Sequence, residues 1–382
     1  MSQLQSITIK GYKSIRSLVD FEIRPINLLI GSNGAGKSNF LSAFKFLASV
    51  VGDNFPVEVQ VWGGPDALLH YGRKITPRLE MDVCFKYEQN PNLQYRGRMQ
   101  NGYKISLEPT RDNEFVFVQE VPWLYVEGHH RALEYSLGPG HRTARVTNDQ
   151  NDASKKVSAH VKEKLKSWRQ YHFHDTGDTA LVKRPNRVYD NDRLQEDAGN
   201  LAACLRRWAK LPIYQSNYQR IVETIHLVAP FFSDFVLRLD EESEMIDLEW
   251  REIGRPDSTW KAHVLSDGTL RFMCLASLLL QPEHFLPDIV IIDEPELGLH
   301  PFAINVLAGL IKRAAETKQV IVSTQSVELL NAFEPEDLVV VERENNASVF
   351  KRLDADDLKD WLEDYALGEL WKRNILGGRP KP

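Results

Sequence analysis

Residues 31–38 have the composition and spacing of a phosphate-binding loop. They read Gly-Ser-Asn-Gly-Ala-Gly-Lys-Ser, which fills every fixed position of the pattern GxxxxGK[ST]. Glycines let backbone N–H groups point inward around phosphate oxygens, and a helix N-terminus adds positive potential. We expect Lys37 to reach the β- and γ-phosphates of a nucleotide and the Ser38 hydroxyl to bind Mg²⁺. The residues predicted to bind ATP here are Gly31, Ser32, Asn33, Gly34, Ala35, Gly36, Lys37, Ser38 and Asn39.

Two carboxylates follow a second apolar run near the other end of the chain. Residues 289–296 read Ile-Val-Ile-Ile-Asp-Glu-Pro-Glu, which indicates a buried strand that ends in Asp293 and Glu294. In a parallel sheet the carboxyl end of a strand faces the ligand crevice. We therefore expect Asp293 to hold Mg²⁺ and Glu294 to orient and deprotonate the attacking water.

A third segment, residues 265–269, reads Leu-Ser-Asp-Gly-Thr and directly precedes a helical pattern. Ser266 and Gly268 at a helix start could form a second anion site, because the helix N-terminus attracts negative charge. The alternative is an ordinary helix cap, for which serine is a preferred residue.

The elements around these residues predict an α/β protein. A strand over 26–30, the phosphate loop and a helix over 39–51 follow one another, and a strand over 4–10 precedes them. An antiparallel β meander is expected next, with a hairpin turn at Asn101-Gly102, because both residues tolerate positive φ. Its strand-like segments are 79–87, 103–107, 115–121 and 132–137.

The second half of the chain is predicted to contain helices followed by an α/β region. A lysine-rich amphipathic helix covers 153–169, and Pro212 separates two helices within 197–228. Segments 235–239 and 245–250 are predicted to form a hairpin, and a helix packed on the core is expected over 358–375. The later α/β region has helices over 270–280 and 302–317 and strands over 287–293, 319–323 and 338–342.

Composition limits the classes to which this chain can belong. The net charge of −6 and the pI near 6.0 differ from the basic balance of dedicated nucleic-acid-binding proteins, so DNA could be contacted only through a local patch such as the lysine-rich helix. No apolar stretch approaches the roughly 18–20 residues of a membrane span. Cys84, Cys204 and Cys274 are far apart and form no CxxC, which predicts buried thiols and a reducing, cytoplasmic location.

The order of these motifs resembles the ABC-type ATPase head shared by SMC and RecF proteins. The phosphate loop, the LSxG segment, the Asp-Glu-Pro segment and the Ser323-Thr324 pair all stand in the family's sequence order. The resemblance implies a two-lobed P-loop NTPase fold and a homodimer that closes on two ATP. It also implies that Ser266 and Gly268 cap the γ-phosphate of the nucleotide bound by the second subunit.

Two positions depart from the family pattern. Gln325 stands where the family usually has a switch histidine; glutamine can bind a γ-phosphate but cannot take a proton, which leaves Glu294 as the only base and predicts slow turnover. No glutamine follows the strand at residues 171–173, where the family's Q-loop is expected. Asp175 or His174 could contact Mg²⁺ or water there, and the alternative is a structural turn.

A narrower resemblance is to small stand-alone bacterial ATPases of the AAA_21 type. It rests on segments 173–176, 200–203 and 367–371 and on Gly377-Gly378-Arg379-Pro380. Related ATPases occur in phage-defence modules and beside Toprim-type nucleases, so the resemblance implies an ATP-driven dimer that controls an effector. The alternatives are a RecF-like DNA-maintenance ATPase and an ATP-gated switch with negligible turnover.

We expect three regions without a long coiled coil. Residues 1–175 should form lobe one with the phosphate loop and the β insertion, and residues 176–255 a short helical arm with a hairpin. Residues 256–382 should form lobe two, with the LSDG and Asp-Glu-Pro segments and the C-terminal helix.

Overall fold

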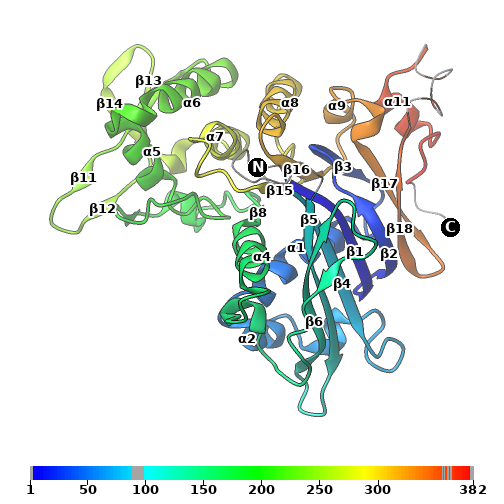
Figure 1. Ribbon diagram of the computed structural model, residues 1–382. Helices are drawn as coiled ribbons and strands as arrows, with labels where there is room; N and C mark the ends of the chain where they lie inside the picture. Colours follow the sequence, from blue (N-terminus) through cyan, green and yellow to red (C-terminus); the bar gives the residue numbers. More distant parts are fainter. Residues whose placement is uncertain are drawn as a thin grey trace. The chain divides into compact units, whose positions relative to one another are not determined.

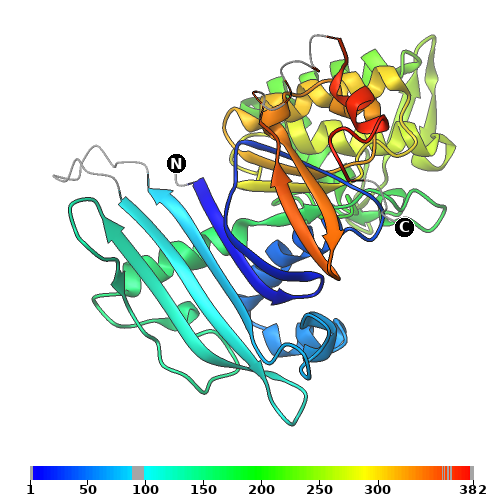
Figure 2. The same cartoon turned by 90° about the vertical axis from the view of Figure 1, so that its right-hand side faces the viewer.

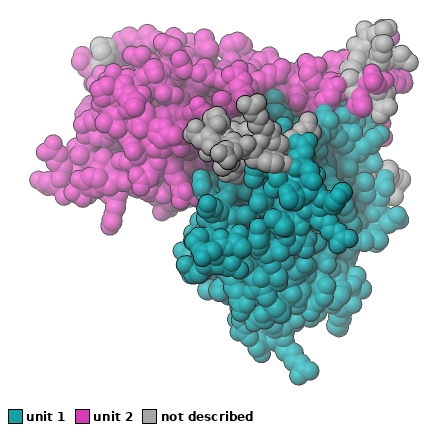
Figure 3. Space-filling view, viewed as in Figure 1, with its two compact units in different colours: residues 1–168, 339–353, 376–382 teal, residues 169–338, 354–375 magenta. Residues whose placement is uncertain are grey.

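The computed structural model describes residues 3–87, 99–354, 356, 358, 361 and 364–378. It has the mixed α/β fold that the sequence predicts (Figure 1). The chain divides into two compact units (Figure 3). Unit 1 consists of residues 1–168, 339–353 and 376–382, and unit 2 of residues 169–338 and 354–375. The C-terminal part of the chain therefore returns to unit 1 twice.

Unit 1 is built on a broad antiparallel sheet of the order β2-β1-β4-β5-β6-β7 (Figure 2). Along β4 buried side chains alternate with more exposed ones, as in a half-buried strand. Helices α1 (Lys37–Val50) and α4 (Lys155–Ser167) belong to the same unit, and Trp168 packs against Phe44 and Phe85 at ring distances of 5.2 and 6.1 Å. The strands are β1 (Gln3–Tyr12), β2 (Ile15–Glu22), β4 (Leu79–Tyr87), β5 (Met99–Pro109), β6 (Phe115–Val126) and β7 (Leu133–Glu134).

The predicted turn at Asn101-Gly102 is wrong, because both residues lie inside β5. Gly102 pairs with Cys84 on one side and with Trp123 on the other. A β-carbon on Gly102 would lie 2.1 Å from the Val83 carbonyl oxygen and 2.3 Å from the Trp123 ring. The glycine thus makes room for the tryptophan ring and is not needed for a positive φ.

The amphipathic helix predicted over 153–169 is confirmed as α4, which covers Lys155–Ser167. Val157, Val161 and Leu165 are buried on one face. Two of its lysines are already bonded within the unit, since Lys155 pairs with Asp152 and Lys162 donates to the Thr147 carbonyl oxygen at 2.9 Å.

The remaining strands of unit 1 surround the phosphate loop. Strand β3 (Ile26–Ile30) precedes the loop, and β17 (Leu338–Glu344) neighbours β3 and pairs antiparallel with β18 (Ala347–Arg352). Asn345 and Asn346, at φ 47° and 63°, form the turn of this hairpin, where asparagine tolerates positive φ. Short helices α2 (Phe55–Val61) and α3 (Pro65–Leu68) complete the unit.

Unit 2 contains the parallel strands that carry the predicted carboxylates. Its strands β16 (Gln319–Ser323), β15 (Ile289–Asp293) and β8 (Arg169–Tyr171) are neighbours in that order. The first four residues of β15 are buried, which is typical of a strand covered on both faces. Helices α7 (Asp267–Leu280) and α8 (Pro301–Ala315) pack on each other in this unit, and α8 also packs on β16.

The helical arm of unit 2 follows the prediction closely. Helix α5 (Leu201–Lys210) and helix α6 (Gln215–Val228) are separated by a 3₁₀ turn that begins at Pro212. The predicted hairpin is present as two short antiparallel ladders, β10 with β13 and β11 with β12. The strands are β9 (Asn186–Arg187), β10 (Phe232–Val236), β11 (Leu239–Asp240), β12 (Met245–Ile246), β13 (Glu249–Glu252) and β14 (Arg255–Lys261).

The predicted C-terminal helix over 358–375 is not one continuous helix. Ala366 has an extended backbone, with φ −71° and ψ 154°, and α11 (Leu367–Lys372) begins only after it. Leu367 and Leu370 of α11 are buried, so this part packs on the core as expected. Arg379 and Pro380 of the resemblance lie outside the described residues.

The three cysteines are free thiols, and Cys204 and Cys274 are buried as predicted, whereas Cys84 is only half-buried. Burial raises the pKa of Cys84, Cys204 and Cys274 to about 12 in each case. Among the described helices, none combines the length and apolar character that a bilayer crossing requires.

Candidate functional site

The phosphate loop in unit 1 has a backbone that requires glycine. Gly34 and Gly36 have φ values of 79° and 115°, where a side chain would be strained. A β-carbon on Gly36 would also lie 2.0 Å from Ser348 Oγ, whereas one on Gly34 would meet no atom within 4 Å. The glycine at position 36 is therefore fixed both by conformation and by packing.

Lys37 is the first residue of α1 and is buried, with 5% of its surface exposed. Its Nζ donates to the carbonyl oxygens of Gly31 and Ser32 at 2.6 and 3.1 Å, so the ammonium group folds back over its own loop. No acidic residue lies in the first turn of α1, which leaves the positive end of the helix dipole unopposed. This charge distribution suits a polyphosphate.

Two further residues of the loop differ in their exposure. Ser38 is exposed, so its hydroxyl is accessible to a ligand, and Asn39 is half-buried and donates from Nδ2 to Ser14 Oγ at 2.7 Å. Within the loop, Ala35 is buried, whereas Asn33 and Gly34 are exposed. Ser38 is thus the loop residue that fits a Mg²⁺ ligand.

In unit 2 the structure brings Glu294 and Gln325 together. Asp293 at the end of β15 lies opposite Ser323 of β16, so the residues that follow each strand are neighbours. Gln325 Nε2 donates to Glu294 Oε1 at 2.6 Å, and the Glu294 amide donates to the Ser323 carbonyl oxygen at 2.8 Å. Glu294 has a positive φ of 42°, a strained conformation of the kind that occurs at functional sites.

Glu296 is buried and fixes the segment that carries Gln325. Its Oε1 accepts bonds from Thr324 Oγ1 at 2.6 Å and from the Gln325 amide at 3.0 Å. Burial raises the pKa of the Glu296 carboxyl group, although these two bonds oppose that shift. The third carboxylate of the Asp-Glu-Pro-Glu segment therefore fixes the backbone that carries Gln325.

Sequence reasoning missed Arg271, which lies in α7 and is 7% exposed. Its Nε donates to the Phe173 carbonyl oxygen at 2.9 Å, its Nη2 to that of His174 at 3.2 Å, and its Nη1 to that of Leu297. One guanidinium thus joins α7, the end of the β8 segment and the loop after Glu296. The available signal was that Arg271, five residues after Ser266, is the one charged residue within the predicted helix 270–280.

Ser266 and Gly268 begin α7, and both have local structural roles. Ser266 is the N-cap residue, and its Oγ accepts a bond from the Thr269 amide at 3.2 Å. A β-carbon on Gly268 would lie 2.3 Å from the Gly298 carbonyl oxygen. Ser266 is exposed and Gly268 half-buried, so this helix start remains accessible from solvent.

The predicted metal residues have different surroundings. Asp175 is exposed, and its Oδ1 accepts a bond from the Gly177 amide at 3.2 Å, which makes a tight turn. His174 is tied to the carboxylate strand, since its Nε2 lies 2.8 Å from the Asp293 carbonyl oxygen. Within the ranges that the structure describes, no three His, Cys, Asp or Glu residues form a metal-binding group.

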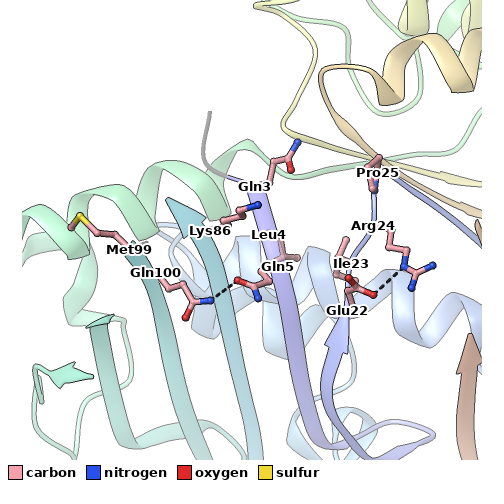
Figure 4. A pocket seen from close by; sticks show the side chains of 10 residues that line it. All are labelled: Gln3, Leu4, Gln5, Glu22, Ile23, Arg24, Pro25, Lys86, Met99 and Gln100. Atoms are coloured by element: carbon pink, nitrogen blue, oxygen red, sulfur yellow. Dashed lines mark hydrogen bonds and ion pairs between the residues drawn. The ribbon is translucent and has the colours of Figure 1, made fainter. Parts of the chain in front are cut away.

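One hollow of about 360 Å³ lies on unit 1 away from the phosphate loop (Figure 4). It is lined at its centre by Gln5, Glu22 and Gln100 and at its edge by Arg24. Gln100 Nε2 donates to Gln5 Oε1 at 2.6 Å and Arg24 Nε to Glu22 Oε2 at 3.0 Å. Four of its polar side chains are thus paired with one another, and none of the predicted site residues lines it.

Comparison with known proteins identifies the family of this chain. The AAA_21 family model, described as "AAA domain, putative AbiEii toxin, Type IV TA system", matches residues 26–331. No curated protein matches the chain.

Two solved structures of Smc heads are similar in fold. A SmcHead bound to the C-winged helix domain of ScpA has 14% identity and a TM-score of 0.58, over 93% of this chain and 99% of that one. The Smc head domain derived from Pyrococcus furiosus, bound to the C-terminal domain of ScpA, has 13% identity and a TM-score of 0.57, over 95% and 99%. The predicted head fold is therefore confirmed.

Proposed function

Because this chain belongs to the AAA_21 family of ATP-binding ATPases, we propose that it hydrolyses ATP in a head dimer and that this cycle controls a protein effector. The observation that carries the proposal is the pairing of Glu294 with Gln325 at 2.6 Å, in a chain that also has a complete phosphate loop. A carboxylate held by one amide donor can still accept a proton from water through its second oxygen.

Each residue has a defined part in this proposal. Lys37 and the amides of the phosphate loop bind the phosphates, and Glu294 takes the proton of the attacking water. Ser38 and Asp293 would hold Mg²⁺, which when bound neutralises charge on the β- and γ-phosphates. Gln325 fixes the Glu294 carboxylate and cannot itself act as a base, which is consistent with slow turnover.

The decisive experiment is to replace the buried lysine and measure ATP binding. Lys37→Ala removes the charge that faces the phosphates, so we expect ATP affinity measured by calorimetry to fall at least about 100-fold. Lys45→Ala, an exposed lysine on the same helix, is the matched control and should bind ATP as the wild type does. Micromolar binding by Lys37→Ala would contradict the assignment of the phosphate loop.

The proposed dimer uses the exposed start of α7. Ser266→Arg places a long charged side chain at the surface that would face the second nucleotide, so ATP-dependent dimerisation should disappear while ATP binding by the monomer persists. Ser233→Arg, at another exposed serine of unit 2, should dimerise normally. Sedimentation with and without ATP distinguishes these results, and an intact ATP-dependent dimer of Ser266→Arg would refute the role of this helix start.

A protein effector is favoured over DNA as the controlled partner. The solved Smc heads are bound to domains of ScpA, and the family description names a putative AbiEii toxin of a Type IV TA system, so a head bound to a protein partner has a precedent. The net charge is −6, and two lysines of the basic helix already have partners within unit 1, since Lys155 pairs with Asp152 at the surface and Lys162 donates to the Thr147 carbonyl oxygen. We therefore place the effector, for which a Toprim-type nuclease is the leading class, before DNA maintenance.

A further inference from the structure

The C-terminal hairpin of unit 1 contacts the phosphate loop from outside at two peptide groups. Arg343 of β17 donates from Nη1 to the Gly34 carbonyl oxygen at 3.3 Å. Ser348 of β18 donates from Oγ to the Ala35 carbonyl oxygen at 2.5 Å. These residues lie more than three hundred positions after the loop, and no motif of the sequence analysis includes them.

A third contact comes from the segment that follows the hairpin. The Ser32 amide donates to the Gly378 carbonyl oxygen at 2.8 Å, and the Gly378 amide donates to Glu342 Oε1 of β17, also at 2.8 Å. Glu342 of the hairpin is thus linked to the Ser32 amide through two hydrogen bonds made by Gly378. Together these contacts fix the loop backbone at Ser32, Gly34 and Ala35.

Ser348 is the most enclosed of these residues. It is 3% exposed, and its Oγ lies 2.7 Å from Ser14 Oγ, which in turn accepts a bond from Asn39 Nδ2 at 2.7 Å. A β-carbon on Gly36 would lie 2.0 Å from Ser348 Oγ, so the hydroxyl packs directly against the loop. One chain of bonds therefore runs from Asn39 through two serines to Ala35.

We propose that Ser348 is a positioning residue for nucleotide binding, through which the β17–β18 hairpin sets the conformation of the phosphate loop. This inference rests on the proposed function. A carbonyl oxygen that is held outward turns the following N–H group of the same peptide inward, because the two point in opposite directions. Fixing the Ala35 carbonyl oxygen outside the loop thus directs the Gly36 amide toward the phosphates. Ser348 touches no reacting atom in this scheme, so it should affect affinity and leave chemistry unchanged.

The test compares phosphate affinity with turnover in the full chain. Ser348→Ala should bind both ATP and inorganic tripolyphosphate about 3- to 10-fold more weakly in calorimetry, because one loop-fixing hydrogen bond is lost. Its kcat at saturating ATP should stay within about twofold of the wild type. Ser348→Thr keeps the hydroxyl and should restore affinity. Ser106→Ala is the matched control, since Ser106 is equally buried in unit 1 and its Oγ has no bonding partner among the described residues.

The outcomes separate the inference from the function on which it rests. A lower melting temperature with unchanged affinities would show that Ser348 only packs the core and would overturn the inference. If Ser348→Ala does not fold, the exposed Arg343→Ala must weaken both ligands by about two- to threefold, and unchanged binding there overturns it as well. Wild-type protein that binds neither ligand would instead refute the proposed function.

Discussion

The Glu294 and Gln325 pair defines the proposed chemistry at the scale of single residues. Sequence spacing predicted both residues separately, because each follows an apolar strand. The structure adds the 2.6 Å bond between them and the positive φ of Glu294. It also adds Glu296, whose Oε1 accepts a bond from the Gln325 amide. Contacts between segments about thirty residues apart depend on strand order, which no local pattern encodes.

Removing only the basicity of Glu294 should separate binding from hydrolysis. Glu294→Gln keeps the shape of the side chain and its acceptor oxygen for Gln325, so ATP should still bind. Turnover should fall about 100- to 10,000-fold, the usual contribution of a general base. Phosphate release under saturating Mg-ATP measures this, with Glu283→Gln, a replacement at an exposed position of unit 2, as the control. Undiminished release would exclude Glu294 as the base.

At the scale of elements, strands and helices with clear periodicity were predicted well. The phosphate loop, α1, α4, α7 and β15 are where the sequence indicates. The Asn101-Gly102 turn failed because the glycine accommodates Trp123, a partner whose position across the sheet the dipeptide itself does not reveal. Arg271 was missed for a related reason, since its three carbonyl partners come from segments that only the fold brings together.

Two glycines in the helices of unit 2 test how closely α7 approaches its neighbour, because a β-carbon would meet another atom at Gly268 and none at Gly309. Gly268→Ala places a β-carbon 2.3 Å from the Gly298 carbonyl oxygen, so unfolding free energy should fall by about 1–3 kcal/mol as that loop is displaced. Gly309→Ala in α8 meets no atom within 4 Å and should be neutral or stabilising by up to about 1 kcal/mol. Urea denaturation measures both, and equal effects would contradict the close approach of Gly298.

At the scale of the whole molecule, one carboxyl group on the large sheet links stability to pH. Asp82 accepts a bond from Trp123 Nε1 at 3.0 Å, and burial raises the pKa of its carboxyl group to about 6 despite that bond. Since the folded state holds this proton more tightly than the unfolded chain, the contribution of Asp82 is fully present below pH 4. It is lost as the pH rises through about 6.

Replacing Asp82 should therefore flatten the pH dependence of stability. Asp82→Asn keeps an acceptor for Trp123 and removes the buried charge, so unfolding free energy at pH 8 should rise by roughly 2–3 kcal/mol relative to the wild type. At pH 4 the two proteins should be similar. Asp53→Asn, at an exposed position, is the control and should follow the wild type at both pH values. A wild-type-like loss of stability between pH 4 and 8 in Asp82→Asn would contradict this role.

The high pKa of all three thiols has a practical consequence for labelling. A cysteine reacts as its thiolate, and a pKa near 12 leaves about one part in ten thousand ionised at pH 8. A fourth cysteine introduced at an exposed position away from the proposed dimer surface, such as Ser233, would therefore be modified far faster than the native three. A fluorophore could be attached to this cysteine without first replacing the three native cysteines. Energy transfer between two labelled copies would then report each closing and opening of the proposed dimer in real time.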